Sequence, residues 1–92
     1  MAKVAIVTAS GLVKTGNGIL WGVNITKAAT GAGTVDIYDN TSASGGKVYS
    51  GDGLVQSSFV TNDGNGGGIP FSNGIYVALG GSTNATVNVI YD

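Results

Sequence analysis

The 92-residue chain contains no histidine, cysteine, glutamate or arginine. Without cysteine it cannot form a disulfide bond, and without histidine or cysteine a structural zinc site is excluded. Enzymes rely heavily on these missing residue types for proton transfer and nucleophilic attack, so the composition argues against an enzyme. Four lysines and five aspartates carry all of the side-chain charge and lie scattered along the chain. Because nucleic-acid binding needs clustered basic side chains, we expect no nucleic-acid partner.

Long apolar runs are also lacking. The run Val-Ala-Ile-Val at residues 4–7 is too short for the hydrophobic region of a secretory signal peptide, and a β-strand explains it better. No run approaches the roughly 20 apolar residues that a membrane-spanning helix requires, so we expect no membrane partner.

Glycine, in contrast, accounts for 17 residues, and apolar and polar residues alternate between the glycine-rich turns. A period of two is the pattern of β-strands, and no segment shows the 3.6-residue period of a helix. The alternation predicts about seven strands, at residues 3–8, 19–26, 34–39, 47–50, 54–61, 75–79 and 86–91. Many short strands with Gly-rich turns favour a sandwich. We therefore predict one domain, residues 1–92, folded as a small all-β antiparallel β-sandwich that is jelly-roll-like.

A domain of this size is marginally stable unless something reinforces it, and neither a disulfide nor a zinc ion is available. Burial of apolar surface against a partner chain is the remaining common device, so we expect a homo-oligomer. The alternation assigns Trp21 to the core together with the residues in phase with it. It leaves four apolar or aromatic residues on the opposite, outward faces, and we interpret them as part of a protein interface: Leu20, Tyr38, Tyr76 and Ile90.

Candidate catalytic and metal-binding residues are few. Asp63 and Asn65 have the spacing of the first ligands in a calcium loop, but the closing glutamate is missing, so an ordinary polar loop is the better interpretation. Asp36 and Asp39 are three residues apart in a predicted strand and so point to opposite faces, which does not suit a carboxylate pair. Neither glycine-rich loop is followed by the elements of a phosphate-binding site. We expect no catalytic residue, no metal and no cofactor.

Five segments carry the recognisable pattern: ASGLV at 9–13, GILWGV at 18–23, GTVDIYDN at 33–40, GIYVALGG at 74–81 and ATVNVIY at 85–91. Their arrangement resembles small β-sandwich virion proteins of tailed bacteriophages, particularly the capsid decoration or cement type. The resemblance implies synthesis in the host cytoplasm and a trimer on the capsid exterior, where it bridges major capsid protein subunits and stabilises the shell. It brings no catalytic residues. As an edge strand, residues 3–8 would pair with a capsid strand or a neighbouring strand.

Two other functions remain alternatives. A carbohydrate-binding or adhesin-like sandwich, associated with a phage head or tail, would bind glycans on exposed aromatic side chains. That function requires Trp21 and at least one tyrosine to be exposed together in a groove, whereas a buried Trp21 counts against it. A small hydrolase that uses aspartate and hydroxyl groups is the third alternative, and it requires a pocket that gathers Asp with Ser or Tyr.

Overall fold

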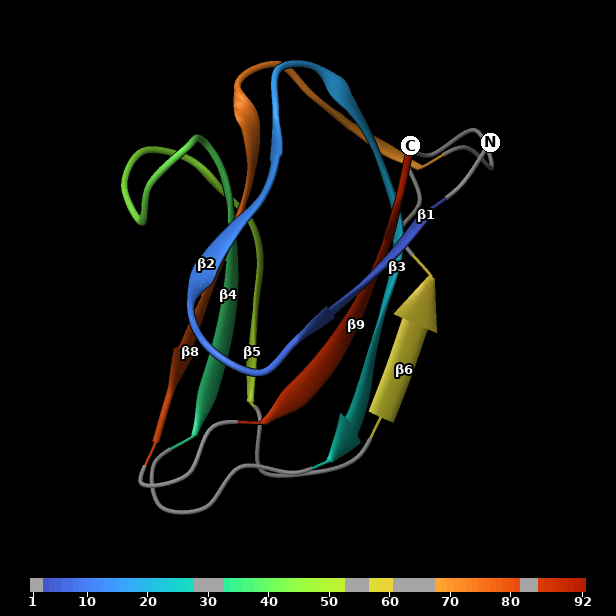
Figure 1. Cartoon of the computed structure of the whole chain (residues 1–92), viewed down its shortest axis with the longest axis vertical. Helices are drawn as coiled ribbons and strands as arrows, with labels where there is room; N and C mark the ends of the chain where they lie inside the picture. The colour runs from blue at the N-terminus through green and yellow to red at the C-terminus, as the bar shows by residue number, and fades with distance from the viewer. Residues whose placement is uncertain (1–2, 28–32, 53–56, 61–67, 82–84) are drawn as a thin grey trace.

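The computed structural model of the chain describes residues 3–27, 33–52, 57–60, 68–81 and 85–92. These residues form nine strands and no helix (Figure 1): β1 Lys3–Val7, β2 Gly11–Thr15, β3 Gly18–Lys27, β4 Thr34–Asp39, β5 Lys47–Asp52, β6 Ser57–Val60, β7 Ile69–Phe71, β8 Gly74–Gly80 and β9 Thr86–Tyr91. The predicted all-β class is confirmed. Within this described part of the chain, no helix is long and apolar enough to span a membrane.

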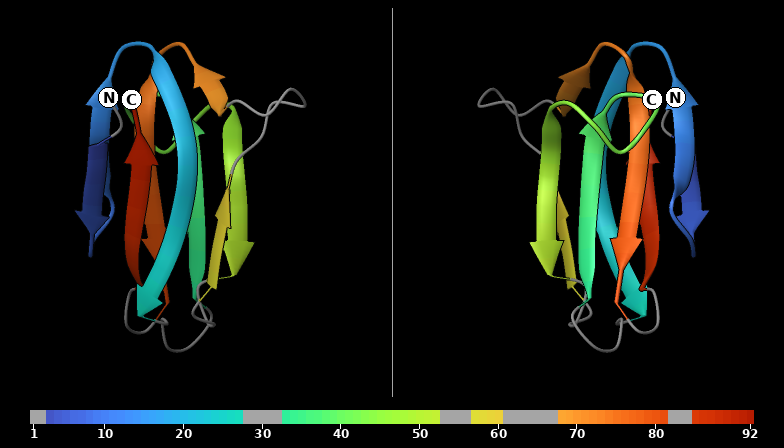
Figure 2. Two further views of the ribbon diagram at one scale, coloured as in Figure 1. Left: turned by 90° about the vertical axis from the view of Figure 1, so that its right-hand side faces the viewer. Right: turned by 90° about the vertical axis from the view of Figure 1, so that its left-hand side faces the viewer.

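The strands form two antiparallel sheets that pack face to face (Figure 2). Sheet A has the order β1-β9-β3-β6, with the short β7 also paired to β3, and sheet B has the order β2-β8-β4-β5. β1 and β3 lie in sheet A, and β2 and β4 lie in sheet B. Later in the chain, β9 inserts between β1 and β3, and β8 inserts between β2 and β4. Two sheets interleaved in this way are the jelly-roll arrangement, so the predicted jelly-roll-like sandwich is also confirmed.

Sequence alternation missed two of the nine strands, β2 and β7. β2 contains a bulge between Leu12 and Lys14, and the extra residue breaks its period of two. β7 has only three residues, and its central Pro70 lies opposite Ile19 of β3. Because proline has no N–H to donate, it is confined to the margins of sheets, and so short a strand offers no period to detect.

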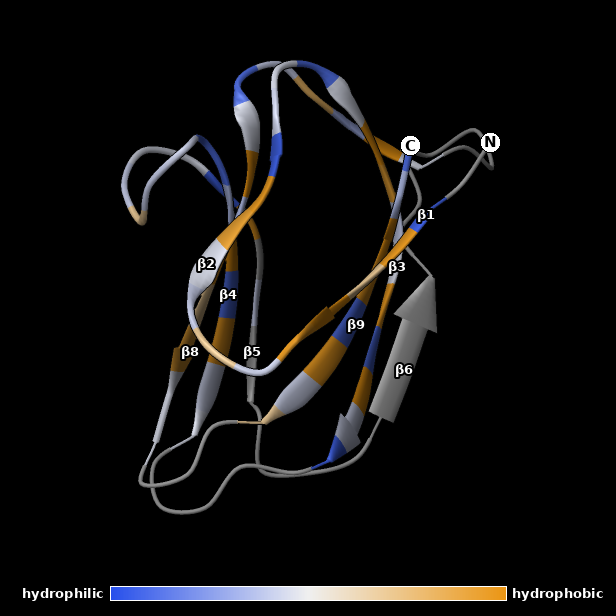
Figure 3. Ribbon diagram, in the orientation of Figure 1, coloured by the Kyte–Doolittle hydropathy of each residue, from blue (hydrophilic) through white to orange (hydrophobic). Residues whose placement is uncertain are grey.

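Both sheets contribute their inner faces to one hydrophobic core. Alternate residues of β3, β4, β8 and β9 point into it, and Figure 3 shows the matching change between hydrophobic and hydrophilic residues along β9. Each fully buried aliphatic side chain contributes about 1.5–3 kcal/mol relative to an exposed one. The core consists of Val7, Leu20, Val23, Ile25, Val35, Ile37, Phe71, Ile75, Val77, Ala85, Val87 and Val89.

The alternation in β3 changes phase at a bulge. Leu20 pairs with Tyr91 and Gly22 pairs with Ile90, so Trp21 is the extra residue between the two pairs. Because a bulge adds one residue, the residues before it change face relative to those after it. Leu20 is therefore fully buried, whereas Trp21 is half-buried and lies outside the core cluster. The predictions that Leu20 faces outward and that Trp21 belongs to the core are both wrong.

The start of β3 is held against Asp92. The backbone N–H of Ile19 donates to the carbonyl of Asp92 at 2.9 Å, and the N–H of Asp92 donates to the carbonyl of Ile19 at 2.8 Å. Gly18 lies beside this pair, where an added Cβ atom would collide with the carbonyl oxygen of Asp92. The close approach of the two backbone segments therefore requires glycine at position 18.

Candidate interaction surface

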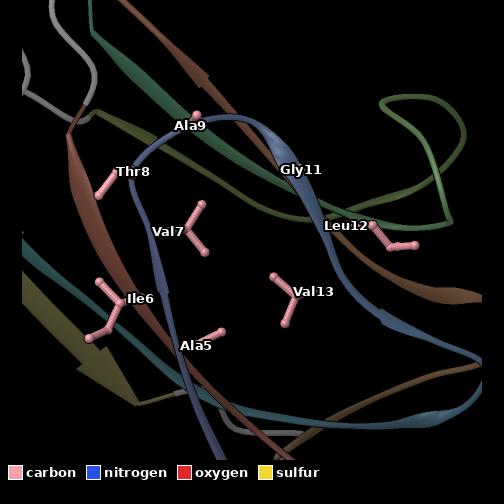
Figure 4. Close-up of a pocket in the computed structure, with 8 residues that line it drawn as sticks. All are labelled: Ala5, Ile6, Val7, Thr8, Ala9, Gly11, Leu12 and Val13. Atoms are coloured by element: carbon pink, nitrogen blue, oxygen red, sulfur yellow. The ribbon is translucent and has the colours of Figure 1, made fainter.

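One flank of the sandwich, between the edge strands β1 and β2, is open. β1 pairs with β9 in sheet A, and β2 pairs with β8 in sheet B. The connection between them is held on β8, because Ser10 Oγ accepts the N–H of Leu79 at 2.8 Å and donates to the Leu79 carbonyl at 3.3 Å. The two strands enclose a groove of about 350 Å³ (Figure 4), lined by Ala5, Ile6, Val7, Thr8, Ala9, Gly11, Leu12 and Val13.

Aliphatic side chains line this groove and continue on its outer sides. In Figure 4, Val7 and Val13 point into the space between the strands, whereas Ile6 and Leu12 point away from it. Ile6 is 72% exposed, Val4 is 61% exposed and Leu12 is 48% exposed, and these are the large exposed hydrophobic residues of the described part of the chain. Their concentration on one flank is typical of an interaction surface, because exposed apolar residues are otherwise scattered. We call the groove residues together with Val4 the β1–β2 flank.

The edge strands differ in their protection against pairing with another chain. The bulge in β2 interrupts its ladder, and β5 has a bulge at Val48. β1 keeps a regular register with β9 over all five residues, and its only charged residue is Lys3 at its first position. Bulges and charged residues are the usual protective devices of edge strands. β1 is therefore less protected than β2 and β5.

Two of the predicted interface residues, Tyr38 and Tyr76, lie next to each other on the outer face of sheet B. They are directly opposite in the β4–β8 pair, and Leu12 of β2 lies opposite Tyr76 on its other side. Both tyrosines are half-buried, and the Lys47 ammonium lies 5.7 Å from the centre of the Tyr38 ring. Leu12, Tyr76, Tyr38 and Lys47 thus form a row across sheet B, which we call the tyrosine row. Its composition suits a protein interface, since a tyrosine combines an apolar ring with a polar hydroxyl.

The other two predicted interface residues lie elsewhere. Ile90 is half-buried in sheet A, opposite Val4 on one side and Gly22 on the other. Leu20 lies in the core and takes no part in a surface. The structure therefore does not bring the four predicted residues together. Sequence reasoning also missed Val4 and Ile6, although the run at residues 4–7 carried a signal, because it is apolar at every position and not only at alternate ones.

Polar contacts on the outer face of sheet B include a serine–carboxylate pair. Ser50 Oγ donates to Asp36 Oδ1 at 2.6 Å, and Lys47 Nζ lies 3.7 Å from Asp36 Oδ2. The pair lies on the outer face of the sheet, and neither of its residues lines the groove. No three potential metal-ligating side chains gather in the described part of the chain, and the loop at Asp63 lies outside that part.

Asp39 binds a different part of the chain from Asp36. Its carboxylate accepts the backbone N–H of Asn73 at 2.8 Å and that of Ser72 at 3.1 Å, both in the turn between β7 and β8. Burial raises the pKa of Asp39, but hydrogen bonds from the backbone N–H groups of Asn73, Ser72 and Gly74 outweigh it and hold the pKa below its ordinary value of 3.8. The ionised carboxylate therefore anchors this turn to the end of β4.

Comparison with protein-family models, with curated proteins and with solved structures finds no match to this chain.

Proposed function

We propose that this chain is a structural virion protein of a tailed bacteriophage, a capsid decoration or cement protein. In this role it binds the capsid exterior as a homo-oligomer, contacts the major capsid protein and stabilises the shell without catalysing a reaction. The observation that carries the proposal is the β1–β2 flank, where Val4, Ile6 and Leu12 are exposed around a groove whose side chains are mostly aliphatic. The sequence resemblance supplies the identity of the partner and implies a trimer. Jelly rolls also occur among viral capsid domains, although a fold alone does not define a function.

The physical chemistry of the domain supports an assembly role. Burial of an exposed valine, leucine or isoleucine against a partner favours association by about 1.5–3 kcal/mol per fully buried side chain. The chain has no disulfide with which to reinforce a small core. A protein that binds the assembled shell and not its separated subunits stabilises the shell by mass action, and many such sites on one shell add together.

The direct test is binding of the purified protein to undecorated capsids built from the major capsid protein of the same phage. We expect the protein to co-sediment with the capsids and to raise the temperature at which they open. Light scattering of the free protein measures its oligomeric state. A stable monomer that does not bind capsids would contradict the proposal.

The tyrosine row is the surface that we expect to contact the capsid. The double variant Tyr38→Ala/Tyr76→Ala should weaken capsid binding at least about tenfold, because aromatic residues near the centre of an interface contribute much of its binding energy. Lys27→Ala is the control, since Lys27 is exposed at the end of β3 in the other sheet. Equal binding of both variants and the wild type would show that the capsid does not contact this row.

The two alternative functions have less support from the described residues. The groove contains neither Trp21 nor a tyrosine, and Trp21 lies in sheet A whereas Tyr38 and Tyr76 lie in sheet B. Trp21 therefore shares no platform with Tyr38 or Tyr76. Hits on a glycan array without capsid binding would favour that alternative. The groove does not support the hydrolase alternative, because no aspartate, serine or tyrosine lines it.

A further inference from the structure

β1 presents a backbone edge that continues sheet A toward solvent. Among the described strands it pairs with β9 alone, and Figure 2 shows it at the outer margin of the sheet. Its ladder is regular, whereas the edge strands β2 and β5 of sheet B are interrupted by bulges. A regular, apolar edge of this kind is a template for pairing with another strand.

We infer that β1 pairs with β1 of a second copy of this chain, in antiparallel orientation about a twofold axis at Ala5. The inference rests on the proposed function, because it specifies one contact of the homo-oligomer that this function requires. In the register with full overlap of the five-residue strands, Val4 lies opposite Ile6 of the second copy and Lys3 lies opposite Val7 of the second copy.

The side chains of β1 make the strand complementary to itself. Val4 and Ile6 share the outer face and are both largely exposed, so the pairing places an aliphatic residue against an aliphatic residue on each side of the axis. On the inner face, the pairing extends sheet A over the open flank and places Lys3 against Val7 of the second copy. Apolar surface is therefore removed from water chiefly on the outer face of the paired strands, at Val4 and Ile6.

Charge selects the antiparallel orientation. Lys3 is the only charged residue of β1, and the residues that line the groove carry no charge. Antiparallel pairing separates the two Lys3 residues by four positions, about 14 Å along the strand, which exceeds the Debye length of about 10 Å in 0.1 M salt. Parallel pairing in register would place the two ammonium groups side by side. A second copy therefore meets this edge without repulsion only when the strands run in opposite directions.

The contact is small, and this determines its strength. An edge of five residues is roughly 17 Å long, and one sheet layer is about 10 Å deep. The area that such an edge buries is therefore well short of the roughly 800 Å² per partner in a stable complex. The dimer in solution is therefore weak, with a Kd of the order of 100 μM. On a capsid, where copies are held close together, the same contact forms at a high effective concentration. Since a twofold contact closes at two copies, a trimer requires a further surface.

Cysteine cross-linking tests both the partner and the register, because the natural chain has no cysteine. Directly opposite residues have Cα atoms about 4.5–5.5 Å apart, which a disulfide spans, whereas diagonal neighbours about 7–8 Å apart are beyond its reach. Val4 is opposite Ile6 of the second copy but diagonal to Val4 of the second copy. We expect oxidation of a mixture of Val4→Cys and Ile6→Cys chains to give a disulfide dimer, and either variant alone to give little. Equal yields from all three samples would overturn the inference.

Sedimentation at concentrations from well below to well above the Kd gives a second measurement. We expect a monomer–dimer equilibrium for the wild type and about hundredfold weaker dimerisation for Ile6→Lys, because the twofold contact contains the substitution twice. Thr34→Lys is the control, since Thr34 is exposed at the start of β4 in the other sheet, lines no part of the groove and should leave dimerisation unchanged. Dimerisation that survives Ile6→Lys, or that both variants lose equally, would overturn the inference.

Capsid binding by the same variants separates this inference from the proposed function. A monomeric Ile6→Lys variant that still binds capsids would support both. A wild-type protein that dimerises through β1 but does not bind capsids would support the inference and contradict the proposed function. If the wild type forms no dimer and Ile6→Lys abolishes capsid binding, β1 pairs with the capsid protein instead, and the inference is wrong.

Discussion

Replacing Leu20 with alanine tests the bulge in β3. The side chain of Leu20 has 0% of its surface exposed and lies between the two sheets. Truncation of a buried leucine removes its transfer free energy and leaves a cavity, so we expect the free energy of unfolding to fall by about 3 kcal/mol. A domain of this size has a total unfolding free energy of roughly 5–14 kcal/mol, and the variant loses a large part of it. At about 4–8 °C per kcal/mol, the melting temperature should fall by roughly 12–24 °C.

Thermal and urea unfolding, followed by circular dichroism, measure this loss. Leu12→Ala is the matched control, because it removes the same atoms from a side chain that is 48% exposed, and it should cost less than about 1 kcal/mol. Both variants and the wild type must be compared at one low protein concentration, since oligomer formation makes stability concentration-dependent. If Leu20→Ala costs no more than Leu12→Ala, Leu20 is not in the core and the assigned bulge is wrong.

Two further substitutions test contacts that hold the ends of strands. Asp39→Asn should lower the free energy of unfolding by about 1–2 kcal/mol at neutral pH, because the ionised carboxylate accepts backbone N–H groups. Its lowered pKa means that this stabilisation is present above the unfolded-state pKa and is lost as the pH falls through the lower folded-state pKa. Urea unfolding should therefore show a difference from the wild type that shrinks in acid, and a pH-independent difference would refute the assignment. Gly18→Ala should cost about 1–3 kcal/mol in the same assay, because the new Cβ atom has to displace the carbonyl of Asp92; an unchanged midpoint would contradict this.

In the proposed function, the two surfaces have separate roles. The tyrosine row lies on the outer face of sheet B, and the edge of β1 lies at the margin of sheet A. Because they belong to different sheets, we propose that one copy contacts the capsid through the first surface and a neighbouring copy through the second. Substitutions in one surface should therefore leave binding through the other intact, apart from the loss of avidity on the shell.

Periodicity alone identified the strands that form the centre of the sandwich. In β4, β8 and β9, alternate residues such as Val35, Val77 and Val89 are buried as the period of two predicts. No bulge shifts the register of the β4–β8 or β1–β9 pairs, so the alternation of side chains continues along these strands. The absence of helix from the described residues also followed from the sequence, since no segment carries the 3.6-residue period. The composition identified the missing chemical groups without reference to any fold.

Pairing between distant strands decided the rest. Whether Leu20 or Trp21 faces the core depends on a bulge, and a bulge exists only in relation to the partner strand β9. The apolar run at residues 4–7 predicted a strand, but only the order of the described strands in sheet A places it at an edge, where Val4 and Ile6 are exposed. The sequence by itself determined which segments are strands, because alternation is a local property. Tertiary structure determined which faces and edges remain for a partner, because those depend on which strands become neighbours.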